Sequence, residues 1–303
     1  MKKIIAKFLR KILSRKLYKL VANGVIVAPC YYRSIINEFE KYYECASVDS
    51  PEKNLLLLRK QAHILDKGVQ RKSAEPGHGT ACRNELASRL KNVTEEQKKD
   101  PTVIWASNVA EKYDALQKGN LAIHPAMSNK ATPVAFDSLL ELMMLRRSNR
   151  CFRDIKIQQD VAQKMICTIN WAASSCNKQP VKCFFTLDPA VAQKALCLCK
   201  GGTGFDGLIP SFWCFCADSR GYVWPTEATL PYIDVALGAQ NFFLAATTLG
   251  VSGTILSWAQ HDDNDETSLR KLLNIPSDYV IAFCAVMGYA EYEYETPARK
   301  LLG

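Results

Sequence analysis

The sequence predicts an α+β fold, in which a mostly helical N-terminal region precedes a domain that contains a β-sheet. Residues 26–118 have the pattern of helices joined by polar connections. The C-terminal half holds four apolar, β-prone runs at residues 181–187, 211–217, 251–258 and 279–289. Helical patterns separate these runs irregularly, and that irregular alternation favours α+β over repeated βα units.

Composition divides the chain into four segments. Residues 1–25 contain a basic amphipathic helix, and residues 26–118 form the helical N-terminal region. Residues 119–136 lack periodicity and contain two prolines, so we predict an interdomain linker there. Residues 137–303 form the sheet-containing domain. The candidate helices of the N-terminal region are residues 32–45, 51–65, 81–91 and 103–118.

Three helical patterns are expected within the sheet-containing domain. Ser138 and Glu141 have the spacing of a capping box, which predicts a helix start at Ser138. Residues 158–173 predict a second helix, and residues 265–273 a short one between the last two strands. Residues 230–249 form a long helix that is apolar nearly all round, so it is expected to be buried in a core or a subunit interface.

The formal net charge of +9 is concentrated at the N-terminus. Residues 1–20 hold eight Lys or Arg and no acid, so the other 283 residues carry 9 − 8 = +1. Binding of nucleic acid would need positive charge spread over the folded body, so we expect no nucleic-acid partner.

The basic N-terminal segment has three interpretations. Residues 3–13 place apolar side chains on one face and lysines and arginines opposite, so residues 1–20 could lie on an anionic membrane surface. The same helix could dock on its own domain or act as a mitochondrial presequence. It is too charged and too short to span a bilayer.

Twelve cysteines do not indicate a disulfide framework, because no secretory signal precedes them. Cys183, Cys214, Cys216 and Cys284 lie in apolar runs and are expected to be small buried residues of a reducing compartment. The cysteine and histidine spacings do not fit a zinc site, so no metal is predicted. We expect a cytoplasmic protein, peripheral at the inner face of the membrane if the N-terminal helix binds there.

Arginines are concentrated after the helix that includes Ser138, at residues 146–152 (RRSNRCF). Guanidinium groups bind phosphate oxygens in a bidentate manner and keep their charge at any cellular pH. The alternative is a solvated face or a cap on the last helical carbonyls.

A polar turn follows one helix later, at residues 174–180 (SSCNKQP), with an amide on either side of a lysine. Amide side chains can recognise the donor and acceptor edge of a heterocycle. A phosphate clamp followed by an amide-bearing loop is what a flavin mononucleotide (FMN) site needs.

The C-terminal half resembles the nitroreductase family of flavoproteins. The similarity is carried by RRSNRCF, SSCNKQP, residues 234–254 (DVALGAQNFFLAATTLGVSGT) and the end GYAEYEYETPARKLLG, in the family's order. It covers roughly residues 137–303 and implies a mixed, mainly antiparallel sheet wrapped by helices. Residues 62–68 and 75–79 resemble an extension of nitroreductase-like proteins associated with bacterial surface-polysaccharide synthesis. His63, Asp66 and Lys67 would then face a substrate or, as we favour, end a helix before Gly68.

The resemblance implies the site residues. Arg146, Ser148 and Arg150 would hold the phosphate and ribityl chain of FMN, and Arg299 and Lys300 would close on the phosphate. Asn177 and Gln179 would face the isoalloxazine ring, with main-chain groups of Ser257 and Trp258 near its hydride-accepting nitrogen. Trp258 departs from the glycine common in the family, and residues 187–209 leave little room for the helical excursion of many relatives.

The implied function is an FMN-dependent oxidoreductase that transfers hydride from NADH or NADPH to a small oxidised substrate by a ping-pong mechanism. No side chain is predicted to be catalytic, because the cofactor carries the hydride chemistry. The family implies a homodimer with the flavin at the subunit boundary. The alternative is a non-catalytic, membrane-associated accessory protein of polysaccharide assembly on the same fold.

Overall fold

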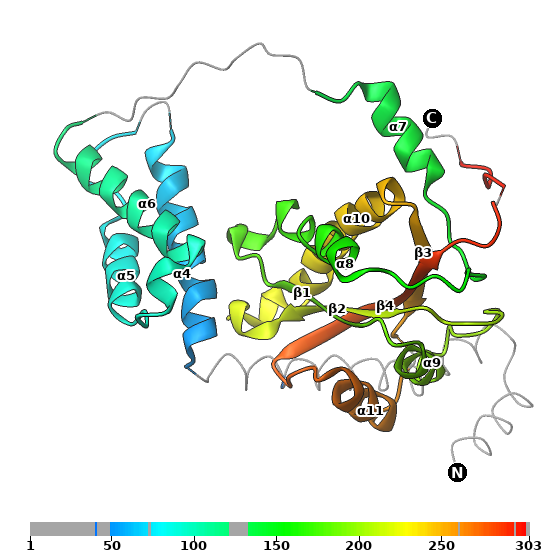
Figure 1. The fold of residues 1–303 in the computed structure, drawn as a ribbon. Helices are drawn as coiled ribbons and strands as arrows, with labels where there is room; N and C mark the ends of the chain where they lie inside the picture. The colour runs from blue at the N-terminus through cyan, green and yellow to red at the C-terminus, as the bar shows by residue number, and fades with distance from the viewer. Residues whose placement is uncertain are drawn as a thin grey trace, which may run out of the picture.

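A computed structural model describes residue 40 and residues 49–71, 74–120, 133–259, 261–293 and 295–300. The predicted N-terminal basic helix lies outside the described residues, as does the helix at residues 32–45 apart from residue 40. Within the described part, eight α-helices and a four-stranded sheet confirm the α+β class and the helical N-terminal region (Figure 1). None of the described helices is long and apolar enough to cross a bilayer.

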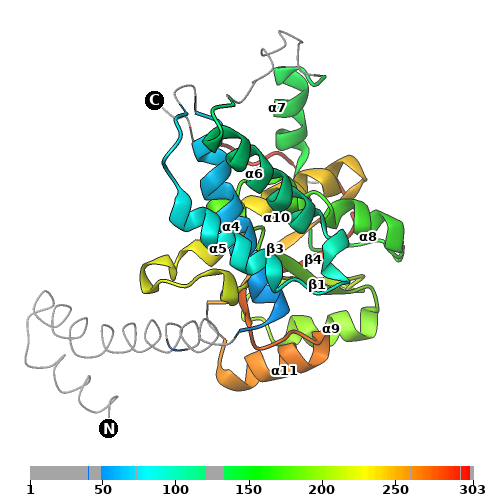
Figure 2. The same ribbon diagram turned by 90° about the vertical axis from the view of Figure 1, so that its left-hand side faces the viewer.

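Three helices form a helical unit, which we define as the described residues between 49 and 120. They are α4 (Pro51–Val69), α5 (Thr80–Lys91) and α6 (Pro101–Gln117). Ser50 and Asp100 cap α4 and α6 through their side chains, each with proline at the first helical turn. Buried apolar residues of all three helices pack into one core. Figure 1 shows this unit beside the sheet-containing domain, and Figure 2 shows it from the side on which it covers that domain.

The predicted end of α4 before Gly68 is wrong. The helix continues through Gly68 to Val69, and the Gln70 N–H bonds to the carbonyls of Asp66 and Gly68. Val69 is buried in the core of the helical unit, and this burial offsets the low helix propensity of the glycine.

The sheet has the strand order β1-β2-β4-β3, with each neighbouring pair antiparallel. The strands match the four predicted runs closely. Parallel pairing in the described part is restricted to one isolated bridge between Cys151 and Asp206. The strands are β1 (Val181–Thr186), β2 (Phe212–Asp218), β3 (Val251–Ser257) and β4 (Tyr279–Tyr289).

Helices cover both faces of the sheet. Phe212, Cys214 and Cys216 of β2 face a core that includes α9 (Pro189–Cys197) and α11 (Asp263–Leu273). The alternate residues of β2 face a core that includes α8 (Gln159–Ile166) and α10 (Leu230–Thr248). Figure 1 shows the two pairs of helices on opposite sides. The strand β2 is therefore buried throughout.

Two helix predictions differ from the structure, and one helix was not predicted. The capping box at Ser138 is wrong, because α7 (Phe136–Leu145) begins after the extended residue Ala135 and has no side-chain cap. The helix predicted at residues 158–173 ends at Ile166, and η3 (Ile169–Trp171) follows it. The region expected to leave little room for the helical excursion of many relatives contains the short helix α9, whose N-cap Asp188 accepts hydrogen bonds from Ala190 N and Val191 N.

Gly253 in β3 provides a test of the sheet packing. A Cβ atom there would lie 2.0 Å from the Val286 carbonyl oxygen, so Gly253→Ala should lower the free energy of unfolding by about 1–3 kcal/mol. Gly68→Ala is the matched control, because open space surrounds that helical position and alanine should stabilise α4 by about 0.5–1 kcal/mol. Urea unfolding measures both. A Gly253→Ala protein as stable as the parent would contradict the observed β3–β4 packing.

Candidate functional site

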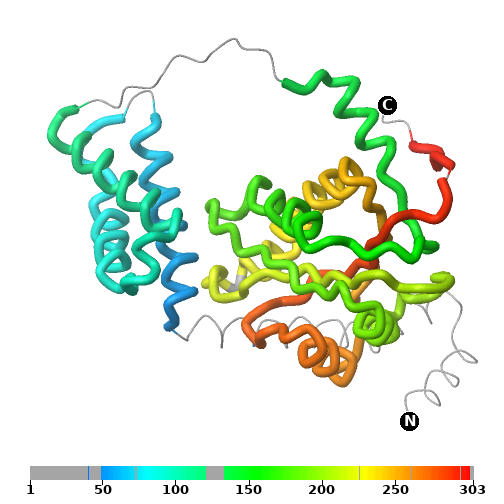
Figure 3. The backbone as a smooth tube through the Cα atoms, viewed as in Figure 1, coloured from blue at the N-terminus to red at the C-terminus, as the bar shows by residue number. Residues whose placement is uncertain are grey.

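Asn149 fixes the arginine-rich segment against the edge strand β3. Its side chain is fully buried, and its Nδ2 donates to Ser252 Oγ at 3.2 Å. Its backbone N donates to the Gly253 carbonyl at 3.4 Å, and its own carbonyl accepts a hydrogen bond from Thr254 Oγ1 at 2.7 Å. Figure 3 shows the chain passing from α7 toward this edge of the sheet. The sequence motif contains Asn149, but our prediction gave it no role.

The C-terminal tail approaches the arginines at the end of α7. Arg147 donates through Nη2 to Thr296 Oγ1 and through Nη1 to the carbonyls of Met144 and Arg146. Burial lowers the pKa of Arg146, and the nearby cations of Arg299 and Arg147 lower it further. The structure thus brings Arg299 close enough for its charge to affect Arg146.

This cation cluster, which we define as Arg146, Arg147 and Arg299, fits an anionic group. In the described part of the chain no carboxylate forms an ion pair with any of the three, and the buried Nε of Arg147 has no hydrogen-bond partner. The like charges that lower the pKa of Arg146 would be stabilised by an anion placed among them. The residues present are therefore compatible with a phosphate.

The other predicted phosphate ligands are near the cluster in sequence but have no described contact with it. Ser148, Arg150 and Lys300 are exposed. The side chain of Arg150 lies beside Gly204, in the loop that follows α9. A Cβ atom added to Gly204 would be 3.8 Å from the Cδ of Arg150.

The amide loop, defined as residues 174–180, has an unusual backbone. Cys176, Asn177 and Gln179 have φ values of 54°, 52° and 52°, in the left-handed region. This region costs roughly 1–2 kcal/mol for each residue that has a Cβ atom. Strained backbone persists where surrounding contacts enforce it, and it is concentrated at functional sites.

Buried polar contacts enforce this backbone. Asp234 Oδ1, on α10, accepts hydrogen bonds from Ser175 N at 2.8 Å and Ser175 Oγ at 2.9 Å. Ser174 Oγ accepts from Gln179 N at 3.0 Å. The two amides predicted to face the ring contact each other, with Gln179 Nε2 donating to Asn177 Oδ1 at 3.2 Å.

Lys178 is a further anchor of the amide loop that our prediction gave no role. Its side chain is completely buried, with Nζ 3.3 Å from Glu227 Oε1 and 4.2 Å from the centre of the Tyr222 ring. Burial lowers the pKa of Lys178, whereas Glu227 acts in the opposite direction.

The two predicted halves of the site lie at diagonal corners of the sheet. The amide loop leads into β1, where Val181 pairs with Ala217 and Ala217 pairs with Val280. Asn149 lies beside Gly253, which pairs with Met287. Seven residues of β4 separate Val280 from Met287, about 23 Å, and three strand spacings add about 14 Å across the sheet. One chain therefore does not bring Asn177 and Gln179 to the arginine-rich segment.

Ser257 ends β3 on the surface, and its Oγ accepts a hydrogen bond from Ala259 N at 3.2 Å. The Trp258 side chain points into the core that includes α9 and α11, where it stacks on His261 with ring centres 4.5 Å apart. The bulky residue that departs from the family's glycine is therefore accommodated by the core.

The four predicted core cysteines are buried free thiols, as expected. Burial raises the pKa values of Cys183, Cys216 and Cys284. Within the residues that the structure describes, no group of three or more His, Cys, Asp or Glu could hold a metal ion.

Glu227→Gln tests the anchoring of the amide loop. Removing the partner of a fully buried cation should lower the free energy of unfolding by about 3 kcal/mol. Asp160→Asn is the control, because the exposed Lys164–Asp160 pair is screened by water and should contribute little. Denaturant unfolding at neutral pH compares the two, and equal stabilities would contradict the role given to Glu227.

Known proteins are similar to this chain in sequence. Residues 216–289 match the model of the Nitroreductase family. A curated protein of Archaeoglobus fulgidus, "Putative NADH dehydrogenase/NAD(P)H nitroreductase", is 25% identical over 160 residues, which are 52% of this chain and 88% of that protein.

Two solved structures are also similar. A protein of that same name from Parabacteroides distasonis has 20% identity and a TM-score of 0.47, over 54% of this chain and 92% of its own. An FMN-dependent nitroreductase of Clostridium difficile has 21% identity and a TM-score of 0.46, over 52% and 91%. The family model and the curated relative therefore show that this chain is similar to nitroreductases over part of its length.

Proposed function

We propose that this chain is an FMN-dependent oxidoreductase that takes hydride from NADH or NADPH and reduces a small oxidised substrate by a ping-pong mechanism. The observation that carries the proposal is the cation cluster of Arg146, Arg147 and Arg299, which lacks a described carboxylate partner. The match to the Nitroreductase family and the name of the curated relative, an NAD(P)H nitroreductase, support the same chemistry.

The chain's own residues would bind and orient the cofactor. Arg146, Ser148, Arg150, Arg299 and Lys300 would hold the phosphate and ribityl chain. In the amide loop, Asn177 and Gln179 would offer donors and acceptors to the ring edge, and main-chain groups at Ser257 would lie near its reactive part. FMN, when bound, supplies the hydride transfer, so no acidic, basic or nucleophilic side chain needs to react.

A homodimer would complete this site. Since the amide loop and the arginine-rich segment lie at opposite corners of one sheet, two chains are needed to place both at one flavin. The helix α7 projects from the domain and buries none of its residues in the described part of the chain (Figure 1). Its exposed apolar side chains, which a second copy could cover, are Phe136, Leu139, Leu140, Met143, Met144 and Leu145.

The accessory alternative predicts a colourless protein that takes up no added FMN. Surface-polysaccharide synthesis as the pathway stays a prediction from the resemblance. Contact with a membrane, and the inner-face location that depends on it, stays a prediction because residues 1–20 lie outside the described residues.

Replacing Arg146 and Arg150 together by alanine should release the flavin. Each charge-assisted hydrogen bond contributes about 1.5–3 kcal/mol, so the double variant should bind FMN on the order of 100-fold or more weakly. Fluorescence titration measures the affinity, and visible absorbance measures the flavin content of the purified protein.

Arg153→Ala is the matched control, because Arg153 is an exposed neighbour outside the predicted clamp and its backbone bond to Tyr289 survives the change. Unchanged affinity in the double variant would overturn the phosphate assignment. A parent protein that binds no FMN would overturn the proposed function itself.

Mixing two defective variants tests the shared site. Asn177→Gly removes one amide at a position that suits glycine, and Arg146→Ala/Arg150→Ala removes two cations. If each site combines the amide loop of one chain with the arginines of the other, subunit exchange should restore about a quarter of the flavin sites. Titration after joint refolding measures the restored fraction. A mixture that binds no more FMN than the separate variants would contradict a site shared between chains.

A further inference from the structure

The helical unit contacts the amide loop directly through Arg59 of α4. The Nε of Arg59 donates to the carbonyl oxygen of Asn177 at 2.7 Å. Its Nη1 donates to Thr102 Oγ1 at 3.1 Å, and its guanidinium lies 5.1 Å from the centre of the Trp105 ring. One side chain therefore joins α4, α6 and the amide loop.

Several features make this contact strong. The donor is a cation that burial has partly removed from water, which lowers the pKa of Arg59 while the nearby carboxylate of Asp100 raises it. Charge-assisted hydrogen bonds of this length are about twice as strong as neutral ones. The planar guanidinium of Arg59 is also fixed in orientation, because Thr102 and Trp105 contact it while its Nε points toward the loop.

The acceptor belongs to the strained part of the loop. Asn177 lies between Cys176 and Gln179, which share its left-handed backbone. Asp234 holds the start of the loop and Glu227 holds Lys178, but both belong to the sheet-containing domain. Arg59 adds a constraint from outside that domain, on the carbonyl of the residue predicted to meet the flavin ring.

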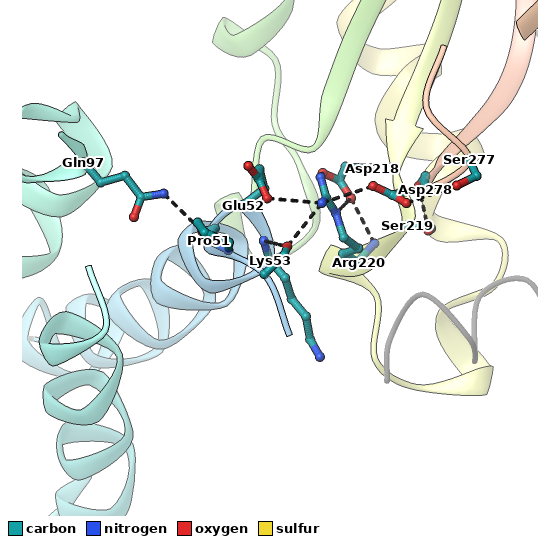
Figure 4. Close-up of polar contacts among 10 residues, drawn as sticks. Pro51, Glu52, Lys53, Gln97, Asp218, Ser219, Arg220, Ser277 and Asp278 are labelled. Atoms are coloured by element: carbon teal, nitrogen blue, oxygen red, sulfur yellow. Dashed lines mark hydrogen bonds and ion pairs between the residues drawn. The ribbon is translucent and has the colours of Figure 1, made fainter. Parts of the chain in front are cut away.

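A second anchor fixes the orientation of α4. Arg220, at the end of β2, is paired with Asp218 at 2.6 Å and Asp278 at 3.1 Å within its own domain, and with Glu52 at 3.3 Å in α4 (Figure 4). It also donates to the N-cap Ser50 at 3.2 Å. The first turn of α4 and Arg59 are thus held against the same domain, so Arg59 meets the loop from a fixed direction.

We propose that Arg59 is a positioning residue of the flavin site, through which the helical unit holds the amide loop in the backbone conformation that receives the ring. The inference rests on the proposed FMN function. It gives the helical unit a defined part in the site: Arg59 acts on the ring through Asn177 and has no part in holding the phosphate.

Two flavins separate ring effects from phosphate effects. FMN carries the phosphate and riboflavin does not, whereas both share the ring. Arg59→Ala should weaken the binding of both flavins by the same factor, on the order of tenfold, and should shift the visible absorption bands of the bound flavin. Arg146→Ala should weaken FMN binding much more than riboflavin binding.

Two further variants control for folding. Arg83→Ala removes the ion pair between Arg83 and Asp114 inside the helical unit, away from the loop, and should leave both affinities and the absorption bands unchanged. Arg59→Lys keeps the charge and the long stem but not the fork, so its affinities should lie between those of the parent and Arg59→Ala. If Arg59→Ala does not fold, the affinities of Arg59→Lys decide the test, and thermal unfolding shows which variants are folded.

The outcomes separate the two proposals. A parent protein that binds neither flavin overturns the FMN function and this inference with it. If the parent binds FMN and the folded Arg59 variants match it in affinity and absorption bands, the positioning role alone is overturned. A loss confined to FMN, or a loss equal to that of Arg83→Ala, also overturns it.

Discussion

The order of the four strands sets the distance between the two predicted parts of the site. The amide loop leads into β1 at one edge of the sheet, and the arginine-rich segment lies beside β3 at the other. Register displaces them along the strands as well. A single flavin cannot reach both corners of one sheet, so the proposed site requires its two parts to come from different chains.

Buried polar side chains position both parts. Asn149 joins one segment to β3, and Asp234 and Lys178 hold the other against α10 and Glu227. Such groups stabilise a fold only when they are paired, and these have partners within normal hydrogen-bonding or ion-pairing distance. The apolar cores determine the positions of the helices, and these polar contacts determine the conformations of the loops that connect to them.

Local patterns predicted most regular elements, because apolar runs mark β1 to β4 and apolar residues at helical spacing mark one face of α4. The apolar surface of α10 is wider than the face that packs in the core, so Ile233 and Leu237 are exposed in one chain. The helix α9 was not predicted, although Asp188 followed by Pro189 is a local helix-start signal. The capping box at Ser138 failed because its spacing is common and specifies a helix start only where the preceding backbone allows it.

The predicted site could be assembled from motifs only in part. Arg146 and Arg299 come from distant parts of the domain, and the charge of Arg299 lowers the pKa of Arg146. The resemblance implied that these two residues lie close together. The bond from Arg59 to Asn177 spans 118 residues, and no local pattern marks a contact of that kind. Left-handed backbone at Cys176, Asn177 and Gln179 was equally invisible, since none of them is glycine.

The anchor at Arg220 has a consequence for how the molecule comes apart. Its guanidinium contacts carboxylates of α4, of β2 and of the turn before β4, so separating the helical unit would remove Glu52 but leave Arg220 paired with Asp218 and Asp278. Opening at this seam therefore leaves the ion pairs inside the sheet-containing domain intact, and the first turn of α4 should exchange its amide hydrogens sooner than the start of β4.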